Sequence, residues 1–221
     1  MKAIITGSTG MVGKAVLLEC IDDTRVEEVL LINRNSLNIS HPKVKEVIHK
    51  DFMDFTAIKN QCKGYDICFH CMGVSVSGMS EEKYTELTYT ISNQLASILF
   101  SVNPNMVFNY VSGTGTDKTE KGKIMWARVK GKTENMILNM GFKDAYMFRP
   151  GIILPERGIK SKTSWYNTFY TIAKPFFPLL IKMKSVTTTS NLGKAMINTY
   201  HYPQPLKYLE GKQINEIATN R

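Results

Sequence analysis

The chain has 221 residues, of which 43% are hydrophobic and 21% are charged. This balance is typical of globular domains and excludes a disordered or collagen-like chain. No apolar run approaches about 18 residues, so we expect no membrane-spanning helix, and Gly7 interrupts the first segment too early for a signal peptide. The net charge of +9 is concentrated in one stretch, because residues 157–209 hold eight basic and no acidic residues.

Short apolar segments alternate with helical patterns along residues 1–155. The expected strands are 2–6, 29–33, 44–49, 67–71, 106–112 and 145–148. The expected helices are 11–22, 80–102 and 125–140. Strands that alternate with helices imply right-handed crossovers and a mostly parallel sheet covered on both faces. We therefore expect an α/β protein with a doubly wound, mostly parallel sheet.

The pattern changes after Pro155. Residues 164–181 are aromatic and apolar but contain two prolines, which predicts two short helical pieces. A further helix is expected over 190–200, with Ser190 or Asn191 as its N-cap. We predict a core of residues 1–155 and a small cap of residues 156–221 that does not fold independently.

The four cysteines include Cys68 and Cys71, which have C-x-x-C spacing. They lie in a strand-like apolar segment, where residues three apart point to opposite faces. We interpret them as buried side chains rather than a redox pair, and we expect no metal site. Thiols of this kind are typical of a reduced, cytoplasmic protein.

A glycine-rich loop follows the first expected strand and opens the first expected helix. In such loops the first glycine allows a tight turn, the second lets a pyrophosphate approach the backbone, and the third lets helix and strand pack closely. The backbone amides at the helix start then face the phosphates. The residues predicted to bind a dinucleotide here are Gly7, Thr9, Gly10, Met11, Val12 and Gly13. The alternative is a purely structural strand-turn-helix.

About twenty residues further on, the second strand ends in Asn33-Arg34 without an acidic residue. A carboxylate there would bind the ribose hydroxyls of NAD, whereas Arg34 suits the 2′-phosphate of NADP. We therefore expect NADP, with NAD less favoured. A solvated surface arginine is the alternative. Asp51 could accept a hydrogen bond from the adenine amine, although aspartates at such positions also cap turns.

With these motifs in place, the chain resembles the short-chain dehydrogenase/reductase superfamily, in its extended or atypical, epimerase/dehydratase-like branch. The resemblance implies a Rossmann fold. It rests on Thr6–Gly13, on Asp51-Phe52, on Cys71-Met72-Gly73, on Tyr110–Gly113, on Arg149-Pro150-Gly151-Ile152 and on Val186–Met196. It implies that Phe52, Cys71, Met72, Gly73, Arg149, Pro150, Gly151 and Ile152 also border the cofactor.

The resemblance further implies a catalytic serine at Ser112 and a catalytic helix with a Tyr-x-x-x-Lys motif. Lys130 is present and is expected to hold the cofactor ribose, but Trp126 occupies the position of the tyrosine. An indole N–H donates a hydrogen bond and does not ionise usefully near neutral pH, so Trp126 cannot replace the tyrosine as an acid or base. Any surviving reaction would need a proton from Tyr84, Tyr89, Tyr110 or water.

Three functions are compatible with these features. The first is an NADP-dependent oxidoreductase or sugar-nucleotide-epimerase-like enzyme with an impaired motif. The second is a non-catalytic protein that senses or binds NADP(H). The third is a peripheral binder of membranes or nucleic acid, suggested by the basic, aromatic stretch. The basic cap favours an anionic small-molecule substrate over a polymer, and a homodimer is one option.

Overall fold

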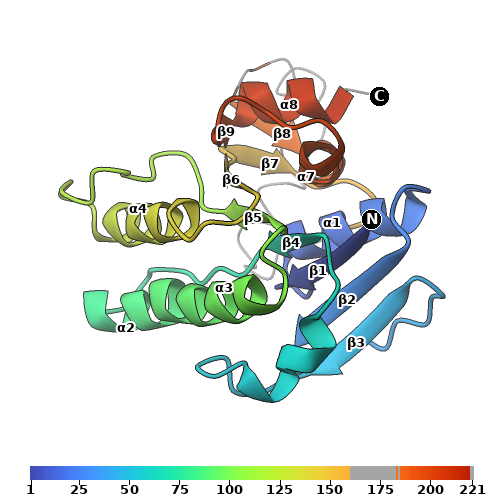
Figure 1. Cartoon of the computed structure of the whole chain (residues 1–221). Helices are drawn as coiled ribbons and strands as arrows, with labels where there is room; N and C mark the ends of the chain where they lie inside the picture. The colour runs from blue at the N-terminus through green and yellow to red at the C-terminus, as the bar shows by residue number, and fades with distance from the viewer. Residues whose placement is uncertain (160–182, 184, 220–221) are drawn as a thin grey trace.

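Seven parallel strands form the central sheet. The computed structural model describes residues 1–159, 183 and 185–219, and the strand order is β3-β2-β1-β4-β5-β6-β9, with every neighbouring pair parallel (Figure 1). The strands are β1 (Lys2–Thr6), β2 (Glu28–Asn33), β3 (Val44–Ile48), β4 (Ile67–His70), β5 (Val107–Val111), β6 (Asp144–Arg149) and β9 (Tyr208–Glu210). The order reverses between β1 and β4, which is where open parallel sheets bind ligands.

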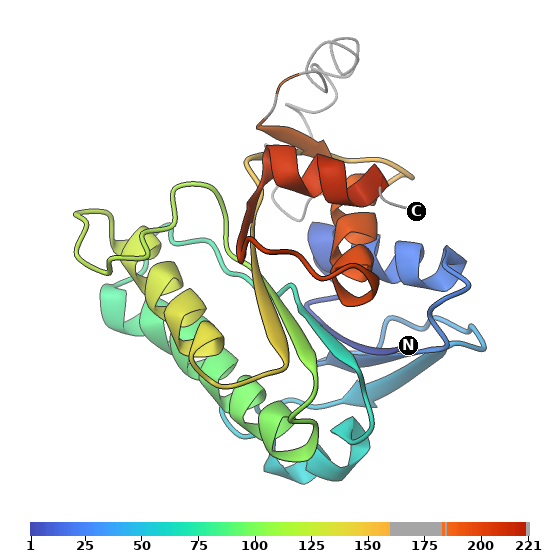
Figure 2. The same cartoon turned by 45° about the horizontal axis from the view of Figure 1, so that its top comes forward.

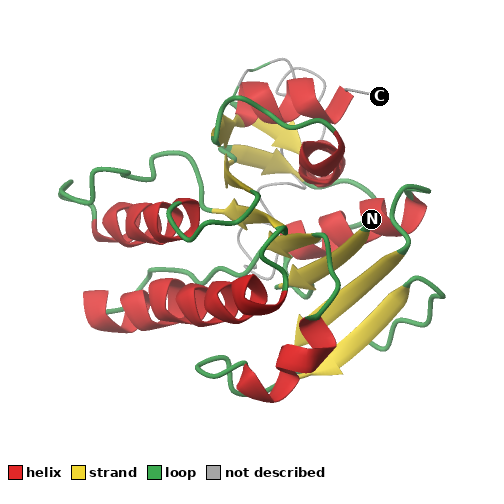
Figure 3. Cartoon of the chain, in the orientation of Figure 1, coloured by secondary structure: helices red, strands yellow, loops and turns green. Residues whose placement is uncertain are grey.

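Helices cover both faces of this sheet (Figures 2 and 3). One face carries α1 (Met11–Asp22) and α7 (Thr189–His201), with α8 (Gly211–Thr219) packed on α7. The other face carries a long helical rod, made of α2 (Glu81–Thr85), the π-helical segment η2 (Glu86–Thr90) and α3 (Ile91–Val102), beside α4 (Met125–Leu138). The expected doubly wound α/β fold is confirmed.

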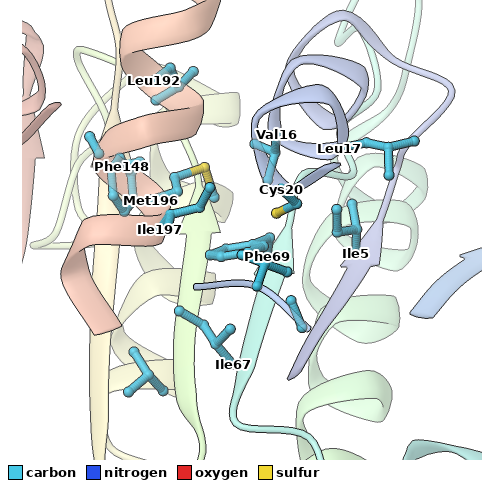
Figure 4. Close-up of a cluster of buried hydrophobic side chains, with 14 of the residues drawn as sticks. Ile5, Val16, Leu17, Cys20, Ile67, Phe69, Phe148, Leu192, Met196 and Ile197 are labelled. Atoms are coloured by element: carbon cyan, nitrogen blue, oxygen red, sulfur yellow. The ribbon is translucent and has the colours of Figure 1, made fainter. Parts of the chain in front are cut away.

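Successive residues of the strands point to opposite faces and build two hydrophobic cores. On one face, Ile5 and Phe69 pack with Leu17 of α1 and Met196 of α7 (Figure 4). On the other face, buried residues of β1, β4 and β5 pack with α3; they include Ile4, Cys68, Phe108, Leu95 and Leu99. Burial on both faces explains why these strands are continuous apolar runs.

Several local features differ from the sequence-based expectation. The N-cap of α7 is Thr188, whose hydroxyl accepts a hydrogen bond from the Asn191 amide at 3.1 Å, and not Ser190 or Asn191. The predicted helix 80–102 is interrupted by the π-helical turn η2. The 3₁₀ segment η1 (Thr56–Cys62), the paired strands β7 (Ile152–Leu154) and β8 (Val186–Thr188), and β9 and α8 were not predicted. The pieces predicted over 164–181 lie outside the described residues.

Residues beyond the predicted boundary at 155 contribute to the same sheet and core. Strand β9 pairs with β6, and α7 packs directly against α1. The approach is close at Gly193, where an added Cβ would lie 2.7 Å from the Cγ atom of Glu19. The division into a core and a cap stays a prediction.

Candidate nucleotide-binding site

The loop between β1 and α1 is folded tightly against the end of β4. Gly7 has a φ of +75°, and a Cβ there would lie 2.7 Å from the carbonyl carbon of Cys71. At Gly13, a Cβ would lie 2.3 Å from the Gly7 carbonyl oxygen. Atoms cannot approach so closely without a backbone shift, so only glycine is accommodated at both positions. The loop thus has the compact form needed for a phosphate to reach the start of α1.

A groove runs along the carboxyl ends of β1, β2 and β4, where the strand order reverses. Eight of the predicted cofactor residues line it: Gly7, Thr9, Gly10, Arg34, Phe52, Cys71, Met72 and Gly73. Met11, Val12 and Gly13 form the first turn of α1 directly behind the groove. The structure therefore brings together residues from four separate segments of the sequence.

Phe52 and Asp51 have different environments. The Phe52 side chain forms part of the groove wall and packs on Phe55, with 5.3 Å between ring centroids. Asp51 is exposed, and its Oδ1 accepts a hydrogen bond from the Met53 amide at 2.9 Å. It therefore caps a turn and does not line the groove, which is the alternative noted from the sequence.

Arg34 stands at the mouth of the groove directly after β2. Its side chain is exposed, and it makes no hydrogen bond or ion pair within the part of the chain that the structure describes. The preceding Asn33 also lines the groove and is buried, with 3% of its surface exposed. Its side-chain amide donates a hydrogen bond to Glu46 of β3, and neither residue was predicted from the sequence to belong to the site.

The predicted catalytic residues lie at the end of β5 and on one face of α4. Ser112 is 5% exposed, and its hydroxyl donates a hydrogen bond to Oε1 of Glu134 at 2.5 Å. The Lys130 ammonium donates to the Ser112 carbonyl oxygen. Trp126 lies one turn before Lys130, and its indole faces Gly115, where a Cβ would lie 3.5 Å from the ring. The indole therefore packs on the loop that follows β5.

Glu134 lies beneath Ser112 and is fully buried. The Arg149 guanidinium binds it through two hydrogen bonds, Nε to Oε1 at 2.9 Å and Nη2 to Oε2 at 2.5 Å. The same guanidinium stacks on the Tyr208 ring, 4.5 Å from its centroid. Arg149, predicted to face the cofactor, is instead bound inside the protein. Glu134 was not predicted as a site residue, because its role depends on a tertiary contact with Ser112. One signal was available: Glu134 follows Lys130 by four residues, which places the two side chains on one helix face.

The segment after β6 continues away from this ion pair. Pro150 is buried, and its carbonyl oxygen accepts a hydrogen bond from the Thr114 amide at 3.0 Å. Gly151 and Ile152 are exposed, and a Cβ at Gly151 would lie 2.7 Å from the Ser185 carbonyl oxygen. This turn therefore holds the end of β6 against the loop after β5 and the segment before β8.

The titratable groups around Ser112 are shifted by burial. Burial lowers the pKa of Lys130 to about 8, although the nearby Glu134 carboxylate opposes the shift. Burial raises the pKa of Tyr110 and of Tyr84, and neither residue lines the groove. Tyr89 lies under the Lys132 ammonium, 4.6 Å from its ring centroid.

Fold and site together define the class: a Rossmann protein of the short-chain dehydrogenase/reductase type, with a groove built for a nicotinamide dinucleotide. Residues 3–116 match the NAD dependent epimerase/dehydratase family, which is more than half of the chain. The protein belongs to this family.

Three similar proteins illustrate the relationship. Protein FMP52-1, mitochondrial, from Scheffersomyces stipitis is 26% identical over 159 residues, which cover 71% of this chain and 69% of the relative. The crystal structure of Candida albicans Gre2 in complex with NADPH has a TM-score of 0.71 at 13% identity, covering 95% of this chain and 77% of Gre2. The UDP-glucuronic acid 4-epimerase of Bacillus cereus in complex with NAD has a TM-score of 0.68 at 12% identity, covering 95% and 76%.

The Gre2 structure holds NADPH and the epimerase structure holds NAD. Together with the family match, this supports binding of a nicotinamide dinucleotide. A small molecule is thus the class of ligand that the fold suggests. Within residues 1–159, 183 and 185–219, no helix has the length and apolarity needed to span a bilayer.

Proposed function

We propose that the protein binds NADP(H) in this groove and acts as a nucleotide-binding protein that lacks the proton donor of catalytic family members. The observation that carries the proposal is the pairing of Ser112 with Glu134. The Ser112 hydroxyl has a single hydrogen, and that hydrogen is donated to a buried carboxylate, so it is not offered to a substrate oxygen. Trp126, at the position of the family's tyrosine, cannot transfer a proton.

The preference for NADP(H) over NAD(H) rests on charge at the end of β2. Arg34 offers a guanidinium that has no partner among the described residues at the groove mouth, and such a group suits a 2′-phosphate. The groove-lining residue before it is an amide, Asn33, and not the carboxylate that would repel a phosphate. Gre2, a structural neighbour solved with NADPH, is compatible with this assignment.

The remaining groove residues have separate roles in holding the nucleotide. The amides of the Gly7–Gly13 loop hold the pyrophosphate at the start of α1, and Phe52 provides an apolar wall. We infer that Lys130, whose ammonium lies at the Ser112 carbonyl, orients a ribose there. A bound nicotinamide would supply hydride-transfer chemistry, but Trp126 cannot supply the accompanying proton.

The test combines binding with turnover. NADPH and NADH are titrated against the purified protein by calorimetry, and a panel of aldehydes and ketones is screened for loss of NADPH absorbance. We expect micromolar binding of NADPH, weaker binding of NADH, and no substrate-dependent oxidation. Turnover that disappears in Ser112→Ala would contradict the non-catalytic proposal. If Arg34→Ala leaves the ratio of NADPH to NADH affinity unchanged, the NADP(H) assignment is wrong.

A second candidate is a slow NADP-dependent oxidoreductase or epimerase-like enzyme, with Lys130 as proton donor. Its support is the pKa of about 8 of this buried amine beside Ser112. An amine with this pKa exchanges protons near neutral pH, as general acids and bases do. Such an enzyme would reduce carbonyl substrates below pH 8 and lose activity above it, as the amine deprotonates. If no carbonyl substrate is reduced at any pH from 6 to 9 in the screen, the enzyme candidate is wrong and nucleotide binding remains as the function.

Partners and location complete the proposal. The ligand beside the nicotinamide is a small, anionic molecule, because basic residues dominate 157–209.

The predicted cytoplasmic location stays a prediction, and the FMP52-1 relative carries the description mitochondrial. Imaging of the tagged full chain, with cell fractionation, decides between the two compartments. Light scattering tests the homodimer option, and vesicle and DNA binding at low salt test the peripheral-binder alternative.

A further inference from the structure

The amide of Asn33 has a fixed orientation at the end of β2. Its Oδ1 accepts a hydrogen bond from the Ser8 hydroxyl at 2.8 Å, and its Nδ2 donates to Oε1 of Glu46 at 2.8 Å. A carboxylate only accepts, so the nitrogen of the amide must face Glu46. Because Asn33 lines the groove, this arrangement determines that the end of β2 presents a neutral amide to the nucleotide.

The same carboxylate also holds the loop that follows. Oε2 of Glu46 accepts from the Ser36 hydroxyl at 2.5 Å, and Oε1 accepts from the Leu37 amide at 3.0 Å. Partial burial raises the pKa of Glu46, but the hydrogen bonds from Ser36, Asn33 and Leu37 outweigh it and lower the pKa. Glu46 is therefore an anion bound by donors on both sides of Arg34 and Asn35.

This arrangement leaves Arg34 without an ion-pair partner in the part of the chain that the structure describes. The guanidinium makes no ion pair with Glu46 or with any other residue that the structure describes, although Glu46 lies on the adjacent strand. The negative charge of Glu46 is instead satisfied by neutral donors. A cation on a loop held at both ends loses little freedom on binding an anion, and such preorganisation increases affinity.

We propose that Glu46 is a positioning residue for the 2′-phosphate of NADP(H). It acts through Asn33, Ser36 and Leu37, which hold the Arg34 loop beside the groove. The inference rests on the proposed binding of NADP(H) and adds the residue that makes Arg34 effective. Glu46 itself does not touch the nucleotide, because it is not among the residues that line the groove.

The test measures discrimination, with 2′,5′-ADP (adenosine 2′,5′-bisphosphate) and 5′-AMP as probes. The two differ only in the 2′-phosphate, so the ratio of their dissociation constants isolates its recognition. We expect the wild-type protein to bind 2′,5′-ADP about tenfold more tightly or better, and Arg34→Ala to remove most of that preference. We expect Glu46→Gln to reduce the ratio about fivefold while the 5′-AMP dissociation constant stays within about twofold, because glutamine cannot accept from both Asn33 and Ser36.

Matched variants separate positioning from a general loss of structure. Glu28 on the same sheet is a carboxylate bound by Tyr65 at 2.7 Å and Lys45 at 2.6 Å, at the opposite end of β2, and Glu28→Gln should leave the ratio unchanged. Ser36→Ala removes one contact to Glu46 at an exposed position and should reduce the ratio about twofold without unfolding. In the double variant Arg34→Ala/Glu46→Gln, the ratio of dissociation constants should equal that of Arg34→Ala alone, since Glu46 acts through Arg34.

The possible failures are distinguishable. If Glu46→Gln weakens both probes equally, or strengthens 2′,5′-ADP, Glu46 is not a positioning residue for the 2′-phosphate. If the wild-type ratio is near one and Arg34→Ala does not change it, the NADP(H) assignment itself fails and the inference with it. A third outcome is that the wild-type protein prefers 2′,5′-ADP and loses this preference in Arg34→Ala. If Glu46→Gln and Ser36→Ala then both keep the preference, the inference about Glu46 is wrong while the NADP(H) assignment stands.

Discussion

Ser112 and Glu134 share a hydrogen bond of 2.5 Å between the hydroxyl and a carboxylate that is fully buried beneath it. Both oxygens of the carboxylate also bind the Arg149 guanidinium. A serine on a strand end is thus connected to an ion pair that joins α4 to β6. The pair has a structural role, and it also determines where the serine proton points.

Replacing Glu134 should destabilise the protein strongly. Glu134→Ala removes one partner of a buried ion pair and leaves the Arg149 charge uncompensated, which typically costs about 3–5 kcal/mol. The measurement is the free energy of unfolding in urea. Glu86→Ala is the control, because its ion pair with Lys83 is exposed, and it should change the free energy by no more than about 0.5 kcal/mol. Equal effects of the two changes would contradict a buried, stabilising pair.

Two glycines of the β1–α1 loop should respond differently to alanine. A Cβ at Gly13 would lie 2.3 Å from a backbone oxygen, so Gly13→Ala should destabilise the fold itself by about 2 kcal/mol or more. At Gly10 the nearest atom would be 3.3 Å away, so Gly10→Ala should fold but bind NADPH at least about tenfold more weakly, because the methyl group occupies the phosphate position. Thermal unfolding and calorimetric titration check the two outcomes. Undiminished NADPH binding by Gly10→Ala would argue against this loop as the pyrophosphate site.

His70 should make stability dependent on pH. It is buried between Thr6 and Ser92, hydrogen-bonded to both hydroxyls at 2.6 and 2.8 Å, and burial lowers its pKa from 6.5 to about 4. The unfolded chain binds the proton first, so stability present above pH 6.5 is lost as the pH falls towards 4. The loss attributable to this group is of order 3 kcal/mol.

The measurement compares unfolding free energies at pH 7.5 and 4.5 in the wild-type protein and in His70→Gln. The informative quantity is the difference between the two proteins, because the pH dependence of the wild-type protein has more than one contribution. The pH dependence should be smaller in His70→Gln. An identical dependence in both proteins would show that His70 does not contribute.

Cys71 should be the cysteine that reacts in the native protein. It is partly exposed in the groove, whereas Cys20, Cys62 and Cys68 are buried. Burial raises its thiol pKa, so labelling by a maleimide at pH 8 should be slow, because the thiolate is the nucleophile. Mass spectrometry should find the label at Cys71, and saturating NADPH should slow its addition. Cys71→Ser should abolish labelling of the native protein, and rapid labelling elsewhere would be inconsistent with the packing described above.

Local patterns predicted much of the fold and part of the site. The strands up to β6 are apolar runs bounded by turns, and the glycine loop and the Trp126-Lys130 spacing are contiguous in sequence, so both were evident. The roles of Glu134 and Glu46 were not evident from the sequence, because each residue acquires its partners only when separate strands and helices pack together. Strand β9 has three residues and depends on pairing with β6, since so short a segment has no periodicity of its own.

The position of α7 has a consequence for how the chain acquires its fold during synthesis. Helix α1, which begins at the glycine loop, packs Val16, Leu17 and Cys20 in a core that α7 closes from about 170 residues further along the chain. Contacts so distant in sequence form slowly, because a long loop must close before they do. A nascent chain stopped before residue 186 would therefore present the apolar face of α1 to solvent, and such intermediates tend to aggregate. The glycine loop leaves the ribosome well before α7 does, so the helix that follows this loop is covered late.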